Sequence, residues 1–237
     1  MRIYLLGLLL CCAGFTFSDN AFSNTTGADN TLTEEEVSQG WQLLFDGKTL
    51  DGWRNFKKDT ASSKWQVVDG ALVLTAKRGG DLITQAQFEN FDLKIDWWIS
   101  DTGNSGIFVL ADEEGRRVYA HAPEVQILDN EKHPDNKLEN HLAGSLYDMV
   151  AAPAASHKPA ETWNTTQIKH NRGQLSIWHN GHLVTDIKIG SPQWQTLVAQ
   201  SKFARWQGFA KNTAGYIGLQ DHGDIVKFKN IKLRQLP

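Results

Sequence analysis

The amino-acid sequence predicts an all-β protein made of two stacked antiparallel sheets with one short surface helix. Short apolar runs recur between turn signals from Trp41 to the C-terminus. Within these runs apolar and polar residues alternate with the period of a strand, and no helical period lasts more than a few turns. A chain of 237 residues is in the size range of a single β-sandwich, so we expect one domain.

Residues 1–23 have the pattern of a signal peptide. Arg2 supplies a positive start, residues 5–12 form an apolar run too short to span a bilayer, and Ala21-Phe22-Ser23 is a small-x-small cleavage site. The sequence therefore predicts export, to the periplasm or the medium. Both cysteines, Cys11 and Cys12, lie in this segment, so the mature chain has no thiol for catalysis. Acylation of either cysteine, which would anchor a lipoprotein to the membrane, is the open alternative.

The segment 24–40 is mostly polar and contains no aromatic residue. This composition is typical of a solvated linker. We therefore expect the folded domain to span residues 41–237.

Tight hairpins are predicted at two turn dipeptides. Asp69-Gly70 joins residues 65–68 to 71–74, and Asn180-Gly181 joins residues 174–179 to 182–189. Aspartate or asparagine followed by glycine favours the two-residue turns that connect antiparallel strands.

Two segments show which face of a strand is polar. Residues 91–99 alternate between an apolar face and a face that carries Trp98 with acids and a lysine, which predicts a binding surface. In residues 124–127 the valine and isoleucine point to the core, so Glu124 and Gln126 share the opposite face.

One short helix is expected from Ser191 to Ser201, because Ser191 can cap it and Pro192 suits its first turn. The remaining pattern gives about a dozen strands and ends in an alternating strand at residues 226–233. Two sheets built from so many short strands are typical of a jelly roll.

Composition excludes several classes of function. The net charge is only −3 and the basic residues are scattered among acids, so nucleic acid is not an expected partner. The chain has neither a phosphate-binding glycine loop nor a Gly-x-Ser-x-Gly nucleophile elbow. Its nine tryptophans are mainly core residues, but some can serve as platforms for the C–H faces of a sugar.

The densest polar cluster lies at the strand that ends near residue 128 and in the charged loop after it. Gln126 stands where a second carboxylate would be needed on the same face as Glu124. An amide can neither titrate nor attack a glycosidic carbon, so ordinary two-carboxylate retaining hydrolysis is disfavoured. The cluster comprises Glu124, Gln126, Asp129, His133, His141, Tyr147 and Asp148.

A second candidate segment ends a strand at residues 218–223, where Gln220, Asp221 and His222 come close together. A plain hairpin turn is the alternative interpretation of this segment. Lys169 is either an exposed strand-end charge or a cation that holds an oxyanion. No compact metal-ligand spacing is present, and the presence of a metal stays open.

Several short motifs, weak singly but specific in this order, resemble the 3-keto-disaccharide hydrolase family. The resemblance covers residues 41–236 and implies a concanavalin-like jelly roll. The motifs are Leu44-Phe45-Asp46-Gly47-Lys48 with Gly52-Trp53, Asn104-Ser105-Gly106-Ile107, residues 124–129, Gly144-Ser145-Leu146-Tyr147-Asp148, residues 159–164, and residues 218–223 followed by Phe228-Lys229-Asn230-Ile231.

What the resemblance implies is action on glycosides already oxidised to a ketone at C3. The ketone acidifies the C2 hydrogen, so a base can remove it and expel the C1 substituent by elimination, after which water can add back. The catalytic candidates are Glu124 and His222 as base or acid, with Lys169 at the enolate oxygen, where a divalent metal is the alternative. The substrate-binding candidates are Trp98, Asn104, Gln126, Asp129, His141, Tyr147, Asp148, Gln220 and Asp221.

Two other functions use the same fold. A lectin-like module would bind a carbohydrate on the same concave face without chemistry, and an envelope domain would bind another protein through its polar loops. An enzyme should respond sharply to substitution of Glu124 or His222, whereas a lectin should lose most when Trp98 or another exposed aromatic is removed. The oligomeric state does not follow from the sequence.

Overall fold

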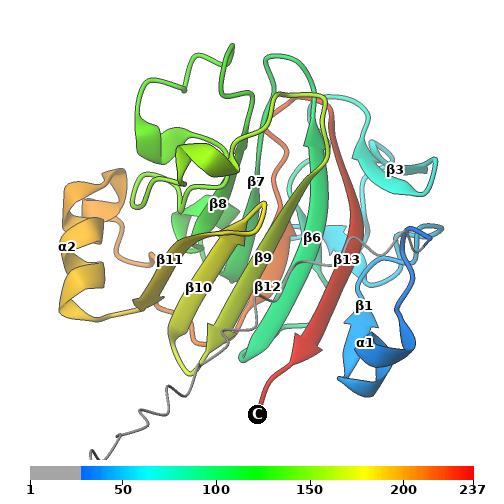
Figure 1. Ribbon diagram of the computed structural model, residues 1–237, viewed down its shortest axis with the longest axis horizontal. Helices are drawn as coiled ribbons and strands as arrows, with labels where there is room; N and C mark the ends of the chain where they lie inside the picture. The colour runs from blue at the N-terminus through cyan, green and yellow to red at the C-terminus, as the bar shows by residue number, and fades with distance from the viewer. Residues whose placement is uncertain (1–27) are drawn as a thin grey trace, which may run out of the picture.

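The computed structural model describes residues 28–237, which fold into two antiparallel sheets stacked on each other (Figure 1). The predicted all-β sandwich is confirmed. The larger sheet runs β11-β10-β9-β6-β13-β4-β3, with β1 also paired to β13, and the smaller sheet runs β2-β5-β12-β7-β8. The larger sheet comprises β1 (Trp41–Leu43), β3 (Trp65–Val68), β4 (Ala71–Leu74), β6 (Phe91–Ile99), β9 (Asn164–Asn171), β10 (Gln174–His179), β11 (His182–Lys188) and β13 (Val226–Gln235). The smaller comprises β2 (Trp53–Asn55), β5 (Leu82–Thr84), β7 (Asn104–Ala111), β8 (Glu124–Leu128) and β12 (Tyr216–Leu219).

The core lies between the sheets, where the inward-facing side chains of both meet. Ile95 and Trp97 of β6 face Ile107 of β7 and Ile127 of β8 in one continuous cluster of buried residues. A strand turns alternate side chains to opposite faces. Because Val125 and Ile127 of β8 point into the core, Glu124 and Gln126 point to the outer side of the smaller sheet.

The two expected hairpins are present, with the turn geometry that their sequences favour. Asp69 and Gly70 have φ angles of 51° and 75° between β3 and β4, and Asn180 and Gly181 have 47° and 82° between β10 and β11. Positive φ at both central residues matches the right-handed twist of the strands that the turn joins.

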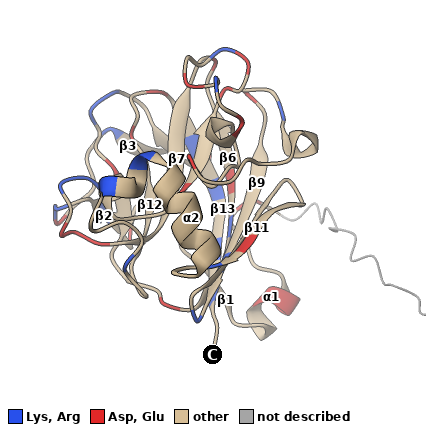
Figure 2. Ribbon diagram, turned by 90° about the vertical axis from the view of Figure 1, so that its left-hand side faces the viewer, with Lys and Arg blue, Asp and Glu red and all other residues tan. Residues whose placement is uncertain are grey.

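The expected surface helix is α2 (Pro192–Gln200), and the Ser191 side chain accepts a hydrogen bond from the Trp194 N–H, as predicted for its cap. The helix lies beside β11 at one side of the sandwich (Figures 1 and 2). It leads directly into the 3-10 turn η4 (Lys202–Arg205). Three more 3-10 turns are η1 (Val118–Ala120), η2 (Glu139–His141) and η3 (Ala154–Ser156).

The predicted linker is wrong for the part of it that the structure describes. The helix α1 (Glu34–Ser38) begins with a capping box at Thr33, and the buried Asn30 exchanges two hydrogen bonds with Asn230 of β13, at 2.7 and 2.9 Å. Lys232 pairs with Glu36 of the helix. A polar composition made this segment look solvated, but its polar groups bond to β13 of the larger sheet.

The predicted signal peptide at residues 1–23, with Cys11 and Cys12, lies outside the described residues, so export and lipid anchoring stay predictions. Within residues 28–237 no helix has the length and hydropathy that a membrane crossing requires. Basic and acidic residues are interspersed along the ribbon in Figure 2, as the sequence indicates.

Candidate active site

A cavity of about 360 Å³ opens on the outer side of the smaller sheet. This volume is within the range of small-molecule sites. Its walls come from strands and from four separate loops, and the lining is polar at the base and aromatic at one side. The lining residues are Asn104, Tyr119, Glu124, Gln126, Asp135, Tyr147, Lys202, Trp206, Gln220 and His222.

Strand β8 supplies the base of the cavity. Its free edge is extended by residues 144–147, which bond to it through Gly144 N–H to the Gln126 carbonyl (2.8 Å) and Tyr147 N–H to the Glu124 carbonyl (2.9 Å). The pairing places the Tyr147 ring beside Glu124. The Oε1 atom of Gln126 accepts a hydrogen bond from the Ile127 N–H at 3.2 Å, so its amide nitrogen is the group left for a ligand.

A glycine on the neighbouring strand makes room for the Glu124 side chain. Gly106 of β7 lies opposite Gln126, and a Cβ atom on it would lie 2.2 Å from Glu124 Oε1. Across this gap the Gln220 Nε2 donates to Glu124 Oε1 at 2.9 Å, whereas the buried Gln220 Oε1 has no partner among the described residues. Such an orphaned acceptor in a cavity is suited to a hydroxyl group of a ligand.

Glu124 is a carboxyl with an unusual proton affinity. Burial raises the pKa of Glu124 to about 8; the Lys202 charge and the Gln220 bond oppose this rise, and the Asp81 and Asp135 charges add to it. Burial also lowers the pKa of Lys202. Desolvation disfavours both charged forms, so Glu124 is a stronger base, once ionised, than an exposed glutamate.

The positively charged group of the cavity, Lys202, is held by a polar network. Its backbone N–H donates to Asp148 at 2.7 Å, and its Nζ lies 4.1 Å from the centre of the Tyr147 ring. The Tyr147 hydroxyl donates to Asp135 at 2.9 Å. His141 places one ring nitrogen 2.9 Å from Asp135 and the other 3.0 Å from Asp148, so it joins the two carboxylates.

An aromatic wall stands across the cavity from the sheet. The rings of Tyr119 and Trp206 lie 5.8 Å apart, and Trp206 packs edge-on against Phe203 of η4 at 5.1 Å. Phe203 in turn stacks on Phe209 at 3.9 Å. Exposed aromatic faces held by buried ones are suited to stacking on a sugar ring.

His222 lies at the rim, in the turn between β12 and β13. The His133 ring, from the loop after β8, meets it edge-on at 6.0 Å. Asp224 is nearby, and its Oδ2 accepts the Asn104 N–H at 3.1 Å. His133, His222 and Asp224 each offer a donor atom, and these atoms lie within 4.8 Å of one another.

Six of the sequence-predicted site residues line the cavity together, namely Asn104, Glu124, Gln126, Tyr147, Gln220 and His222. His141 and Asp148 do not line it but hold Tyr147 and Lys202 through the network. Thus two segments that the sequence identified separately form one site.

Two other predicted substrate-binding residues have structural roles instead. Asp129 is buried, and its carboxylate accepts N–H groups of Thr102, Glu131 and Lys132 at 2.7 to 3.2 Å, which fixes the turn after β8. Asp221 accepts the Gly80 N–H at 2.7 Å and lines a neighbouring depression. Neither carboxylate lines the cavity.

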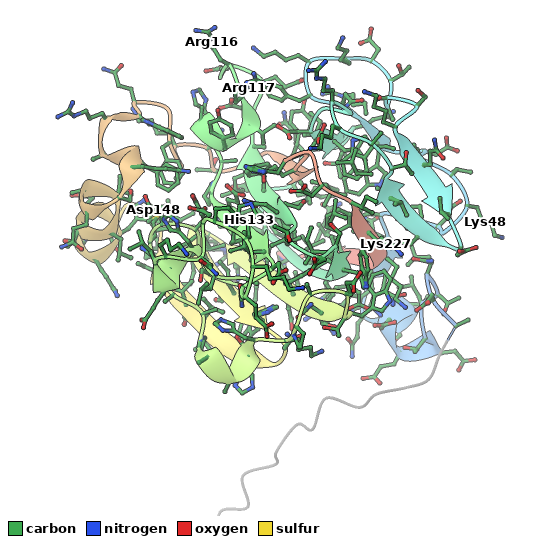
Figure 3. All side chains as sticks on the ribbon, turned by 90° about the horizontal axis from the view of Figure 1, so that it is seen from above. Lys48, Arg116, Arg117, His133, Asp148 and Lys227 are labelled. Carbon is green, nitrogen blue, oxygen red and sulfur yellow. The ribbon has the colours of Figure 1, made fainter. Side chains whose placement is uncertain are left out.

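Trp98 and Lys169, the other two predicted site residues, do not line the cavity. Trp98 lies on β6 in the larger sheet, with Lys227 Nζ 4.2 Å from its ring centre, and Lys169 lies opposite Asp92 on the neighbouring β9. Figure 3 shows Lys227 well to one side of His133 and Asp148. Strand alternation correctly gave these residues an outward face, but it does not say which of the two sheets carries the cavity.

Four lining residues were missed by sequence reasoning: Tyr119, Asp135, Lys202 and Trp206. Asp135 lies in the charged loop that the sequence singled out. Lys202 and Trp206 lie shortly after the predicted helix, and that position is their only signal in the sequence. Tyr119 has no comparable local signal.

Comparison with known proteins finds a family and a relative that are both named for the cleavage of 3-keto sugars. Residues 40–234 match the family described as the 3-keto-alpha-glucoside-1,2-lyase-like domain. A 3-keto-disaccharide hydrolase of Bacteroides thetaiotaomicron is 38% identical over 230 residues, which covers 84% of this chain and 79% of the relative.

Solved structures show the same fold. A presumed glycosyl hydrolase of Parabacteroides distasonis is 30% identical with a TM-score of 0.83, over 89% of this chain and 100% of that one. A second from the same organism is 26% identical with a TM-score of 0.59, over 83% and 99%. A family match over nearly all of the described residues, together with 38% identity to a relative, shows that this chain belongs to the 3-keto-α-glucoside-1,2-lyase-like family.

Proposed function

We propose that this protein cleaves 3-keto-glycosides by removing the C2 proton and eliminating the C1 substituent, with water then adding to the product. Its family and the glycoside-hydrolase character of its relatives support a carbohydrate-active enzyme. The single observation that carries the finer proposal is Glu124, one buried carboxyl with a raised pKa, with the amide Gln126 and no second carboxylate on the same strand face.

The reaction needs a base, a proton donor and a group that stabilises the enolate. The base takes the proton from C2, and the electron pair of the C–H bond moves toward the C3 carbonyl to form the enolate. The enolate then re-forms the ketone as C1=C2 forms and the C1–O bond breaks, and the leaving oxygen takes a proton. Addition of water across C1=C2 completes a net hydrolysis. Two opposed carboxylates are not required, in contrast to an ordinary glycosidase.

We assign Glu124 as the base. A pKa of about 8 is close to the value at which a general base is both ionised and strong. Lys202 lies near enough to oppose this pKa rise, and we assign its charge to the enolate oxygen in place of Lys169. A cation in a partly desolvated cavity stabilises developing negative charge far better than it would in water.

The remaining lining residues bind and orient the sugar. His222, at the rim, is our candidate for donating a proton to the leaving oxygen. The free acceptor of Gln220 and the amide nitrogen of Gln126 suit sugar hydroxyl groups, and Tyr119 and Trp206 suit the C–H face of the ring. With the predicted signal peptide, we propose that this chemistry takes place outside the cytoplasm.

The test compares a 3-keto-glucoside that carries a chromogenic aglycone with its unoxidised parent. We expect release from the keto form alone, together with exchange of the C2 hydrogen for solvent deuterium. The Glu124→Gln variant should lose both signals while still binding the sugar. Binding without release from either compound would replace this proposal with a lectin function. Release without any C2 exchange or unsaturated product, and undiminished in the variant, would exclude elimination by Glu124.

A further inference from the structure

A hollow lined by basic side chains lies next to the cavity. It consists of two overlapping depressions of about 410 and 520 Å³, which share Arg78, Gly80, Asp81 and Arg117. We call this hollow the basic depression. It is formed by the loops after β2, β4 and β12 and by the segment before η1, and its positively charged lining residues are Lys58, Lys77, Arg78 and Arg117.

Two segments of the chain lead from the cavity into the basic depression. Tyr119 lines the cavity, and Arg117, two residues before it, lines the depression. After β12, Gln220 lines the cavity, Asp221 lines the depression and His222 lines both. A substrate longer than one sugar ring can therefore extend from the cavity into the depression. Because our candidate proton donor to the leaving oxygen stands where the two meet, the depression lies on the side of the leaving group.

The positive charges of the basic depression are available to a ligand. Within residues 28–237, none of its four basic side chains forms an ion pair or a side-chain hydrogen bond, and all four are exposed. Lys64 Nζ donates to the carbonyls of Lys77 (2.6 Å) and Arg78 (3.3 Å), which holds this loop and adds a further positive charge nearby. Four basic and two acidic side chains give the lining a net charge of +2, whereas the whole chain carries −3.

The two acidic side chains of the lining are held by backbone N–H groups and not by these cations. Asp221 accepts the Gly80 N–H at 2.7 Å, and Asp81 accepts the Asp221 N–H at 2.9 Å. Burial raises the pKa of Asp81 to about 6, and the Arg117 charge opposes this rise, so Arg117 lies close to it. The second carboxylate oxygen of Asp81 takes no hydrogen bond within the described residues, which leaves an acceptor for a ligand hydroxyl.

We infer that the basic depression binds an anionic leaving group, so that the preferred substrates are 3-keto-glycosides whose C1 substituent carries a carboxylate or a sulfate. Guanidinium groups such as those of Arg78 and Arg117 match the paired oxygens of these anions. A hollow with a positive lining also raises the local concentration of an anionic substrate. This inference rests on the proposed function, because it places the reacting sugar ring in the cavity.

The test measures by calorimetry how three unoxidised phenyl glucosides bind to the wild-type protein. Their phenyl rings carry a para carboxylate, a para sulfate or an uncharged para carboxamide. The proposed reaction does not consume an unoxidised glucoside, so binding is measured without turnover. Exposed charge pairs each contribute little, and we expect several together to make the anionic ligands bind about 3- to 10-fold more tightly than the carboxamide. Added salt should shrink this preference, and the tighter of the two anions identifies the group.

Variants locate the preference. Arg78→Gln and Arg117→Gln should each lower it, and the double variant should bind all three glucosides alike. The matched control Lys48→Gln removes the same charge from an exposed position that lies far from Arg117 in Figure 3, and it should keep the wild-type preference. Equal affinity of the wild type for charged and uncharged ligands, no measurable binding of the anionic ones, or a preference retained in the double variant would overturn the inference.

The corresponding 3-keto-glucosides separate this inference from the proposed function. We expect the wild-type preference for the anionic compounds to reappear in kcat/KM and to disappear in the double variant. A charge preference in binding without cleavage of any 3-keto compound would leave the anion site standing and would overturn the elimination. Cleavage of all three 3-keto compounds, without a charge preference in binding, would do the reverse.

Discussion

Replacing Glu124 with glutamine should stabilise the fold while it removes activity. Burial raises the pKa of Glu124 from its ordinary 4.5 to about 8. Each unit of difference between the folded and unfolded pKa is worth about 1.36 kcal/mol. Ionising this carboxyl in the folded state therefore costs at most about 5 kcal/mol at high pH. Lys202 loses a nearby opposite charge in the variant, so we expect a net gain on the order of 1–3 kcal/mol in the free energy of unfolding.

The sign of the effect depends on pH in a defined way. The folded pKa of Glu124 lies above the unfolded value. The wild-type protein therefore has its full stability, with respect to this group, below about pH 4.5, where Glu124 is protonated in both states. It loses that stability as the pH rises through about 8. Glutamine has no proton to lose. The stability difference between variant and wild type should thus be near zero at the acidic end and should widen across this window.

Urea unfolding followed by tryptophan fluorescence, at several values from about pH 4.5 to about pH 8.5, measures this difference. The matched control is Glu113→Gln, because Glu113 forms a two-bond ion pair with Arg54 at 2.7 Å that lowers its pKa. That variant should be less stable than the wild type at neutral pH. Parallel wild-type and Glu124→Gln curves across the window, or a loss of stability in both variants, would refute this account of Glu124.

Three further outcomes test the site. Lys202→Met should lower kcat/KM. It should also move the rising limb of the pH profile of kcat/KM, which we expect near pH 8, to higher pH, because the lysine charge opposes the raised pKa of Glu124. An unmoved limb would show that Lys202 does not influence the pKa of Glu124. Gly106→Ala places a Cβ 2.2 Å from Glu124 Oε1, so we expect at least about a tenfold loss of activity and about 1–3 kcal/mol of stability, measured by kinetics and urea unfolding. Trp206→Ala should raise KM about 3- to 10-fold through lost stacking, whereas Trp98→Ala should leave KM within about twofold; the reverse pattern would restore the larger sheet as the binding face.

Local pattern in the sequence was enough for much of the fold. The hairpins at Asp69-Gly70 and Asn180-Gly181 follow from residues that accept positive φ, and the cap at Ser191 follows from one side chain and the backbone N–H of Trp194 three residues on. Alternation along β8 placed Glu124 and Gln126 on one face, and the structure shows both in the cavity. Each of these features depends on neighbours in the chain, which the sequence displays directly.

Only the tertiary structure decided which sheet carries the site and which residues complete it. Trp98 and Glu124 both alternate outward, but they belong to different sheets, and strand order is set by pairings between distant segments. Lys202 reaches the cavity from the 3-10 turn that follows a helix, and Asn30 joins the fold through bonds to Asn230, 200 residues away. The proton affinity of Glu124 likewise depends on burial beneath loops that lie far from it in sequence. A pattern of residues predicts local structure, whereas burial and the proximity of charges arise only when distant parts of the chain pack together in the folded state.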